Sequence, residues 1–533
     1  MRSCVLLAGC LVSGLDVPTR AFAAEPDAAH RLVLTLRRRS PDDGGAVRIR
    51  REKVVWDARK TAAIVCDMWD KHWCKGATRR VGQMAPRMNE LLAAARAKGA
   101  LIIHAPSGTM THYRNHPARK RAQDAPRAKD LPKGIGGWCR RMASEAGVAW
   151  PLDQSDGGCD CQPTCKQGRA WSQQLGAIEI RDADAISDSG EEVWNLLAAR
   201  GIEHVLLMGV HTNMCVIGRP FGLRNLKRFG KDVVLVRDLT DTMYNSRKAP
   251  FVSHFRGTEL IVEYIETRVC PTVLSSDVTR AGRFRFPGDP RKRVVFAIAE
   301  GEYHTWETLP AFAERVLADK CSLAVELLFA DPQDRNVIPH LADALGAADL
   351  LFLSVRRRAL PAADLQAVRA HVKAGRPVVG IRTASHAFDT RGKHPDGHAE
   401  WRTFDPDVLG GHYSGHHGNG PKTTVSFAKA AGRHPILSGI RPGFVVSGSL
   451  YRTSPLAKGT TPLLIGTISG KEPEPLAWTN ACGTARVFYT SLGHPDDFAG
   501  KDPPTVRLLT NAVFWALDRP VPQLPPQAAK SGG

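Results

Sequence analysis

Short apolar strands alternate with amphipathic helices along most of the chain, and this alternation constrains the fold more than any other feature. Parallel strands need long crossover connections, usually helical, which cover both faces of the sheet. The first half therefore predicts a doubly wound parallel α/β domain. Its strands are expected at residues 61–67, 101–104, 204–210 and 232–237, with helices at 88–98 and 191–200.

The alternation stops at residues 281–293 (AGRFRFPGDPRKR), whose proline, glycine and arginine content is typical of a linker. A second α/β series follows, with strands expected at residues 294–299, 323–329, 350–355, 377–381 and 487–492 and helices at 362–374 and 505–517. A chain of 533 residues exceeds what one core usually organises. We therefore expect two domains, 53–280 and 294–520, with residues 24–52 as a polar leader.

The first 23 residues have the layout of a signal peptide: Arg2, an apolar stretch at 4–15, and A-F-A at 21–23. A small-x-small triplet of this kind fits the specificity of signal peptidase. The prediction is export to the periplasm or the extracellular space, with cleavage after Ala23. A frayed tail is one alternative. A lipoprotein anchor at Cys10 is a lesser one, because only nine residues precede it.

The formal net charge of +20 comes from basic residues that are scattered in short runs, such as 37–39 and 356–358. There is no long basic helix, aromatic platform or zinc finger in the sequence, so no specific nucleic-acid partner is expected. No segment approaches the roughly 18 uninterrupted apolar residues of a membrane span. The expected partners are a small-molecule substrate and a carbohydrate ligand, and oligomer formation stays open.

Two reactive residues follow predicted strands of the first domain. Asp67 closes the strand at 61–67, and Cys215 follows the strand at 204–210, where a helical stretch begins. Ligands of parallel sheets bind at the carboxyl ends of strands. A thiol at a helix N-terminus is expected to have a lowered pKa, and a nearby carboxylate can accept its proton. Singly, each residue has a structural alternative: a strand cap for Asp67 and an inert buried thiol for Cys215.

The segments AAIVCDMWD and GIEHVLLMGVHTNMCVIGRP closely resemble the isochorismatase-like (nicotinamidase-related) cysteine hydrolase family, over roughly residues 55–275. The resemblance implies that Asp67 is the general base and Cys215 the nucleophile. It also implies an oxyanion hole of backbone amides around Met214 and Cys215, and a cis peptide between Val210 and His211. The implied chemistry is thiolate attack on a small amide or imide, followed by hydrolysis of a thioester.

This sequence lacks the lysine that family members carry before the nucleophile strand, where residues 178–182 read IEIRD. Arg181 is the expected charge substitute, and Lys71 or Lys166 would serve only if loops fold back. Arginine cannot exchange a proton as lysine does, so an altered or inactive site stays open.

A cysteine-rich insert departs from the family pattern as well. Cys159, Cys161 and Cys165, with Cys139 or Cys74 as a fourth ligand, could form a tetrahedral thiolate metal site. Disulfides are favoured for an exported protein, and free thiols are a third option. His72 and His104 lie near strand ends where related nicotinamidases hold a metal. Because the Asp-x-His companion pattern is missing, both are expected to be structural, and no catalytic metal is expected.

The segments PVVGIRTASHAF and FYTSLGHPDDF, with a terminal helix ending in AVFWAL, resemble the ThuA-like (trehalose-utilisation) domain. That domain is a flavodoxin-like relative of class I glutamine amidotransferases. The resemblance puts Arg382 where the amidotransferases have a nucleophilic cysteine, so glutaminase chemistry is not expected. A polar pocket for a hydroxylated or anionic ligand is expected instead. Its members would be Arg382, Ser385, His386 and His494, with Tyr303, His304, His412, His416 and His417 on surrounding loops.

Two functions are therefore open. The first is an exported cysteine hydrolase that cleaves a C–N bond of a small amide or imide, with an accessory ThuA-like domain. The second is a non-catalytic ligand- or carbohydrate-binding protein in which both sites have lost their chemistry. A sugar-directed activity of the ThuA-like half is a third possibility.

Overall fold

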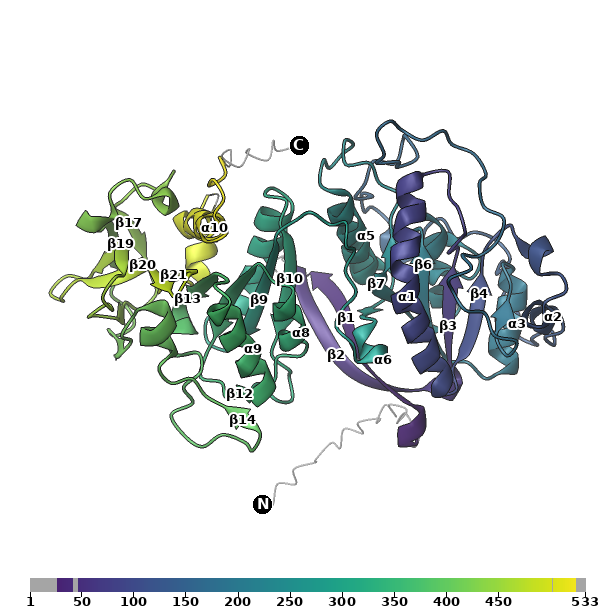
Figure 1. Cartoon of the computed structure of the whole chain (residues 1–533), viewed down its shortest axis with the longest axis horizontal. Helices are drawn as coiled ribbons and strands as arrows, with labels where there is room; N and C mark the ends of the chain where they lie inside the picture. Colours follow the sequence, from purple (N-terminus) through teal and green to yellow (C-terminus); the bar gives the residue numbers. More distant parts are fainter. Residues whose placement is uncertain (1–25, 42–46, 501, 524–533) are drawn as a thin grey trace, which may run out of the picture.

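The computed structural model describes residues 26–41, 47–500 and 502–523. It contains two large α/β sheets, one from each half of the chain (Figure 1). The predicted signal peptide, residues 1–23, lies outside the described residues. Among the helices within these ranges, none has the length and apolar character needed to cross a bilayer.

The first sheet has eight strands in these ranges, in the order β2-β1-β8-β7-β6-β3-β4-β5. The last six in that order run parallel, which confirms the predicted doubly wound architecture. Their bounds are β3 (Thr61–Cys66), β4 (Leu101–Ala105), β5 (Ala185–Ile186), β6 (His204–Val210), β7 (Asp232–Asp241) and β8 (Thr272–Val273). The helices are α1 (Lys75–Ala97), α2 (Pro117–Gln123), α3 (Gly190–Ala199), α4 (Leu223–Arg228), α5 (His254–Arg268) and α6 (Ser276–Thr279).

Strand β3 shows why its residues form a central strand. Every residue of β3 is buried, and its side chains alternate between the two faces. Ile64 packs in the cluster that includes α3, α4 and α5, whereas Val65 packs in the cluster that includes α1 and α6. Helices therefore cover both faces, and the end of β3 lies in the middle of the sheet.

The segment predicted as a polar leader forms a hairpin instead. Strands β1 (Arg31–Pro41) and β2 (Val47–Asp57) pair antiparallel and extend the first sheet through β8. Leu32 and Leu34 are buried, and the arginines before and after them obscured this alternation in the sequence. The first sheet thus begins at Arg31 rather than at residue 53.

The second sheet has nine strands in the described ranges, in the order β10-β9-β11-β13-β21-β20-β19-β16-β17. The five predicted strands are present and parallel: β9 (Arg293–Ala299), β10 (Ala324–Phe329), β11 (Leu350–Val355), β13 (Val378–Ile381) and β21 (Ala485–Thr490). An antiparallel extension was not predicted: β20 (Glu474–Cys482), β19 (Thr461–Thr467), β16 (Thr423–Phe427) and β17 (Phe444–Val446). Helices α8 (Leu341–Gly346) and α9 (Ala362–Lys373) pack on one face, and α7 (Thr305–Ala311) and α10 (Pro504–Ala516) on the other.

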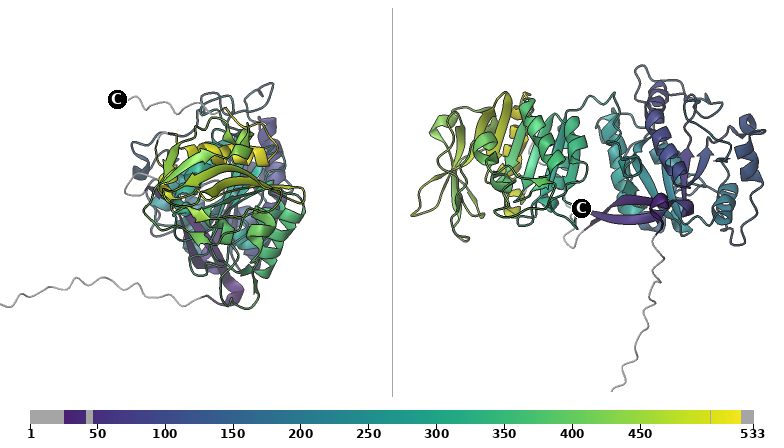
Figure 2. Two further views of the ribbon diagram at one scale, coloured as in Figure 1. Left: turned by 90° about the vertical axis from the view of Figure 1, so that its left-hand side faces the viewer. Right: turned by 60° about the horizontal axis from the view of Figure 1, so that its bottom comes forward.

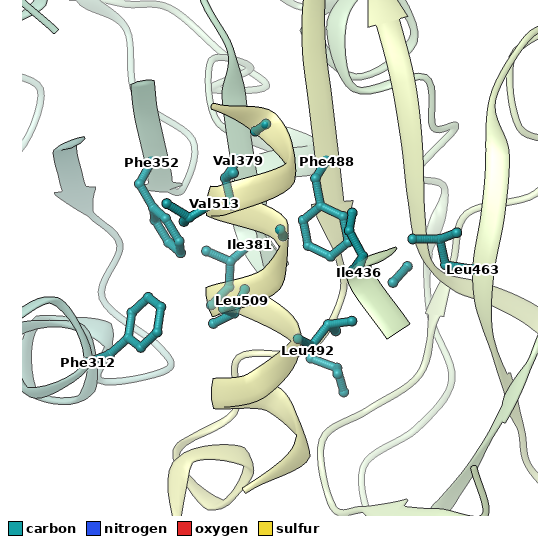
Figure 3. Close-up of a cluster of buried hydrophobic side chains, with 14 of the residues drawn as sticks. Phe312, Phe352, Val379, Ile381, Ile436, Leu463, Phe488, Leu492, Leu509 and Val513 are labelled. Atoms are coloured by element: carbon teal, nitrogen blue, oxygen red, sulfur yellow. The ribbon is translucent and has the colours of Figure 1, made fainter. Parts of the chain in front are cut away.

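The core beside α10 is drawn in Figure 3. Leu509 and Val513 of the helix point toward Val379 and Ile381 of β13 and toward Phe352 of β11. All five side chains are fully buried. This packing fixes the end of β13, where the predicted second-domain pocket begins.

Charged contacts join the two halves across the hairpin, which lies between the two sheets (Figures 1 and 2). Arg39 of β1 forms a buried ion pair with Glu314 of the second half at 2.6 Å. Arg51 of β2 lies over the ring of Phe329. The segment interpreted as a linker, residues 281–293, has no helix or strand before β9 begins. It is nevertheless packed, because its Arg291 pairs with Glu259 of α5.

Candidate active site

Cys215 lies in a one-turn helix, η5 (Thr212–Val216), directly after β6. The Thr212 hydroxyl donates to the backbone carbonyl of Asp241 at 2.9 Å, and the Asn213 side chain bonds the backbone of Met243 in both directions. These bonds tie the turn to the end of β7. The sulfur-bearing residue is only 6% exposed, whereas Met214 beside it is 45% exposed. The Val210–His211 peptide is cis, as the resemblance implies.

Asp67 follows β3 and is fully buried. One carboxylate oxygen accepts the Ser107 backbone N–H at 2.8 Å. The other accepts the Arg219 guanidinium at 3.1 Å, and the Cys215 thiol also hydrogen-bonds this carboxylate. Folding therefore brings together the two residues that the sequence singled out from strands far apart in the chain.

Gly209 makes this approach of β3 and β6 possible. Its φ is +111°, and a Cβ there would lie 2.0 Å from the backbone oxygen of Cys66. Only glycine fits a backbone contact this close. The end of β6, which leads into the nucleophile turn, is thus held against β3.

Arg219 is the cation of this site, and the sequence interpretation missed it. It follows Cys215 by four residues, one helical turn, so both side chains lie on the same side. Its guanidinium bonds Asp67 and the Cys215 thiol, and it lies 4.7 Å from the Trp138 ring. The i,i+4 spacing within CVIGR was the available signal.

Arg181, the predicted charge substitute, is exposed and pairs with Glu179 at 3.0 Å. Its side chain follows a surface loop, and its partner neutralises it there. Lys71 and Lys166 are exposed as well, and Lys166 lines the hollow beside the cysteine cluster described below. The positive charge at Cys215 therefore comes from the nucleophile turn itself.

The electrostatics of the pair differ from the sequence prediction. Burial, with the neighbouring Asp67 charge, raises the pKa of the Cys215 thiol well above its usual range, opposite to the lowering expected from a helix N-terminus. Burial also raises the pKa of Asp67, and Arg219 opposes that shift. The resting pair is thus a protonated thiol beside a carboxylate that holds its proton more readily than an exposed aspartate does.

The backbone of the turn surrounds the sulfur. The Met214 amide, one of the two expected oxyanion donors, donates to the His211 carbonyl at 2.9 Å. The His211 N–H lies against the Cys215 sulfur and lowers its pKa. Behind the turn, Asp241 accepts Arg80 at 2.7 Å and His254 at 2.9 Å, which anchors the end of β7.

The two histidines expected to be structural lie in packed surroundings. His104 is fully buried and contacts Asp184 at 3.2 Å and Gln174 at 3.1 Å. His72 stacks with Trp171, and its ring lies 4.8 Å from that of His211.

The structure gathers Cys159, Cys161 and Cys165 with Cys74, whereas Cys139 lies apart and contacts the Arg141 carbonyl. All ten cysteines of the described residues are free thiols, so the favoured disulfides are not formed among them.

Arg382 begins the turn after β13 and is buried in the second domain. Its guanidinium donates to the Ser491 carbonyl at 2.8 Å and to the Ser449 hydroxyl at 3.2 Å. The same group lies 4.0 Å from the ring of Tyr303 and 4.8 Å from that of Tyr451. The charge is therefore held between aromatic rings by bonds that fix its orientation.

The other predicted pocket residues lie around Arg382. The Ser385 hydroxyl donates to the Arg382 carbonyl at 3.3 Å, and His386 stacks on Tyr413. Burial, with Arg357 nearby, lowers the pKa of His386 to about 2, so this imidazole is neutral. His494 is half-buried, and its ring lies 6.3 Å from Tyr303.

The histidines that were predicted on surrounding loops have different surroundings. The ring of His416 lies 6.3 Å from that of Tyr451, which contacts Arg382. His304 stacks on Trp306 and pairs with Glu307, away from Arg382. His412 is exposed and His417 half-buried. Sequence reasoning missed Asp405, whose pKa burial raises to about 7.

Comparisons with known proteins agree with this division into two halves. Residues 295–516 match the family model described as ThuA, trehalose utilisation. A comparison with curated proteins gives no match. A ThuA-like protein from Bacteroides uniformis shares 16% identity over 44% of this chain and 94% of its own, with a TM-score of 0.34.

Two further solved structures are similar to a different part of the chain. A cysteine hydrolase from Pseudomonas syringae pv. phaseolicola shares 16% identity over 42% of this chain and 93% of its own, with a TM-score of 0.27. An isochorismatase family protein from Burkholderia thailandensis shares 16% over 42% and 95%, with a TM-score of 0.26. The chain joins an N-terminal domain similar to isochorismatase-family cysteine hydrolases to a C-terminal ThuA-like domain.

Proposed function

We propose that the first domain is a cysteine hydrolase that cleaves a C–N bond of a small amide or imide. One observation carries the proposal: the Cys215 thiol bonds the buried Asp67 carboxylate, and Arg219 contacts both groups. A buried carboxylate with a raised pKa is a better general base than an exposed one, because its pKa is closer to the working pH.

In the first half of the reaction, Asp67 takes the thiol proton while the sulfur attacks the substrate carbonyl carbon. The negative oxygen of the tetrahedral intermediate is stabilised by the Cys215 amide of the η5 turn and by Arg219, since the Met214 amide already donates to the His211 carbonyl. Collapse breaks the C–N bond, and the proton on Asp67 passes to the leaving nitrogen. An acyl thioester on Cys215 and a free amine or ammonia result.

In the second half, Asp67 takes a proton from water as the water oxygen attacks the thioester carbonyl. Collapse breaks the C–S bond, and the proton on Asp67 returns to the sulfur while the carboxylic acid leaves. Arginine remains charged throughout, so every proton transfer runs through Asp67. Arg219 thus supplies the positive charge without taking part in proton exchange.

The surroundings of the sulfur support a small substrate. Cys215 is barely exposed, Met214 beside it in the chain is partly exposed, and Arg219 lies against the Trp138 ring. Trp138, at 49% exposed, and Met214 offer apolar contact surface beside the Arg219 cation. A small planar acyl group with a polar end matches this mixture.

The test incubates the full chain with a panel of small amides, imides and carbamoyl compounds. Intact-mass analysis is expected to find an acyl adduct on Cys215, with ammonia or amine released. Cys215→Ala should abolish both signals. Cys270→Ala, which changes another buried thiol of the same domain, is the matched control and should keep them. Turnover that survives in Cys215→Ala would overturn the proposal.

The second domain is proposed as an accessory ligand-binding domain. Arg382 follows β13, and its guanidinium lies between the rings of two tyrosines. A guanidinium beside aromatic hydroxyl groups favours a hydroxylated or anionic ligand. Calorimetric titration of the full chain with mono- and disaccharides and with inorganic phosphate tests this role. Binding should be lost in Arg382→Met. A protein that binds such a ligand but never acylates Cys215 would fit the alternative, a non-catalytic binding protein.

Export is part of the same proposal and rests on the signal-peptide layout of residues 1–23. Mass analysis of the mature N-terminus should show cleavage after Ala23. An uncleaved or lipidated N-terminus would contradict it.

A further inference from the structure

Four cysteines from two distant segments lie together beside the start of α1. Cys74 is the residue before this helix. Cys159, Cys161 and Cys165 lie in a loop that begins after Asp153, whose backbone N–H donates to the Ala249 carbonyl. Their sulfur atoms all lie within 4.8 Å of one another, and the Cys74 and Cys161 sulfurs are 3.8 Å apart. Four mutually close sulfurs are the donor set of a single tetrahedral ion.

The spacing fits a metal better than it fits disulfides. A tetrahedral zinc ion with Zn–S bonds of about 2.3 Å holds its sulfurs about 3.8 Å apart. A disulfide would draw two sulfurs to about 2.0 Å and leave each pair separate from the other. In the described residues all four thiols are free and form one cluster.

Backbone N–H groups already point at the sulfurs, as they do around metal-bound thiolates. Gly76 N–H donates to the Cys161 sulfur at 3.2 Å, and Lys75 N–H donates to the Cys165 sulfur at 3.5 Å. These donors belong to the first turn of α1, a 23-residue helix whose N-terminus is electropositive. These two N–H groups are thus placed to donate to metal-bound thiolates.

Gly76 leaves room for this arrangement. A Cβ at this position would lie 3.3 Å from the Cys161 sulfur and 3.7 Å from the Cys74 sulfur. A side chain there would crowd the Cys161 sulfur and touch the Cys74 sulfur. The first turn of α1 therefore accommodates the cysteine cluster because it has a glycine at residue 76.

We propose that Cys74, Cys159, Cys161 and Cys165 bind one structural Zn²⁺ ion. Four protein thiolates fill the tetrahedral coordination and leave no open position for substrate, so the ion stabilises structure and takes no part in the hydrolysis. The proposal is independent of the proposed function.

The ion would hold one wall of the active-site region. The Cys159 and Met243 side chains pack in one cluster, and Met243 bonds Asn213 of the nucleophile turn. Asp160, between two of the cysteines, accepts the Ser246 backbone N–H at 2.9 Å. The cysteine loop is thereby fastened to the segment after β7, which anchors η5.

The test measures metal in the full chain purified without chelator. Elemental analysis is expected to find about one zinc per chain, and Cys161→Ser should lose it. Cys139→Ser is the matched control, because Cys139 lies outside the cluster, and should keep its zinc. Cobalt exchanged into the wild-type chain should give the intense thiolate charge-transfer and visible bands of a tetrahedral four-sulfur site.

A second measurement keeps the proposal testable if Cys161→Ser fails to fold. The wild-type chain is denatured with chelator, without reductant, and alkylated. All four cysteines of the cluster should then carry the alkyl label. Unlabelled cysteines joined in disulfides would overturn the proposal, and so would absence of stoichiometric zinc or the presence of another metal in its place.

Discussion

Two turns of this molecule occupy equivalent places, each at the carboxyl end of a central parallel strand, yet they present opposite chemistry. The turn after β6 carries the Cys215 thiol, which bonds the Asp67 carboxylate. The turn after β13 carries Arg382, whose guanidinium is bonded to Ser491 and Ser449. The first turn couples a nucleophile to a proton acceptor, whereas the second fixes a cation.

The difference shows that the fold positions a turn at the end of the strand, whereas the side chains on that turn determine its chemistry. In the first domain the charges are arranged so that a proton can move between sulfur and carboxylate. In the second, the Ser385 hydroxyl donates to the Arg382 carbonyl and lies 3.1 Å from a neutral His386. The proposed function therefore places catalysis at the first turn and ligand binding at the second.

The largest expected effect separates these assignments. Asp67→Asn keeps the shape of the side chain but removes the proton acceptor, so kcat/KM of C–N cleavage should fall by about 10²–10⁴-fold. Arg382→Met should change kcat/KM by less than about twofold, because Arg382 touches neither the sulfur nor Asp67. Steady-state kinetics with the best substrate of the panel measures both. A large loss in Arg382→Met alone would reverse the assignments.

The second effect is a pH dependence of stability near the Arg382 turn. Burial raises the pKa of Asp405 from 3.8 to about 7, so between these values the folded domain holds a proton that the unfolded chain releases. The free energy of unfolding should fall as pH rises through this window, by up to ~4 kcal/mol. Asp405→Asn does not titrate and should lose this dependence.

Urea unfolding of wild type and Asp405→Asn at a series of pH values checks the shift. The free energy of unfolding of Asp405→Asn, relative to that of wild type, should increase from about pH 4 to about pH 8. Parallel stability profiles for the two proteins would show that Asp405 titrates as an ordinary aspartate.

The fold was predictable where apolar runs were continuous. Strands β3, β6, β9 and β11 are buried on both faces, so each is an unbroken apolar segment that the sequence displays directly. The β1–β2 hairpin was not predictable in this way. Its charged side chains, such as Arg39, are stabilised by partners from the other half of the chain.

The candidate site shows the same limit. Asp67 and Cys215 could be located because a strand end and a motif mark each of them. For Arg219 the i,i+4 spacing to Cys215 was the one signal in the sequence, because its partner Asp67 is distant in sequence and close only after folding. The fourth cysteine of the cluster was ambiguous for the same reason, since Cys74 and Cys139 are equivalent until the loop is placed.

A smaller effect tests the role of the cation. Arg219→Met should lower kcat/KM by about 10–150-fold, the value of a charged hydrogen bond of about 1.5–3 kcal/mol. Arg219→Lys keeps the charge and should recover part of the loss. Arg181→Met is the matched control and should be indistinguishable from wild type, because Arg181 pairs with Glu179 on the surface. Equal losses at both arginines would contradict the assignment of the cation.

The most direct test titrates the Cys215 thiol through the pH dependence of its alkylation by iodoacetamide, followed by peptide mass analysis. The account predicts an apparent pKa above the ordinary value of about 8.5 in wild type. In Asp67→Asn the pKa should fall, because the neighbouring charge is gone, while turnover is lost. A wild-type thiol that titrates at or below 8.5 or so, and is unchanged in Asp67→Asn, would contradict the coupling of sulfur and carboxylate on which the proposed hydrolysis depends.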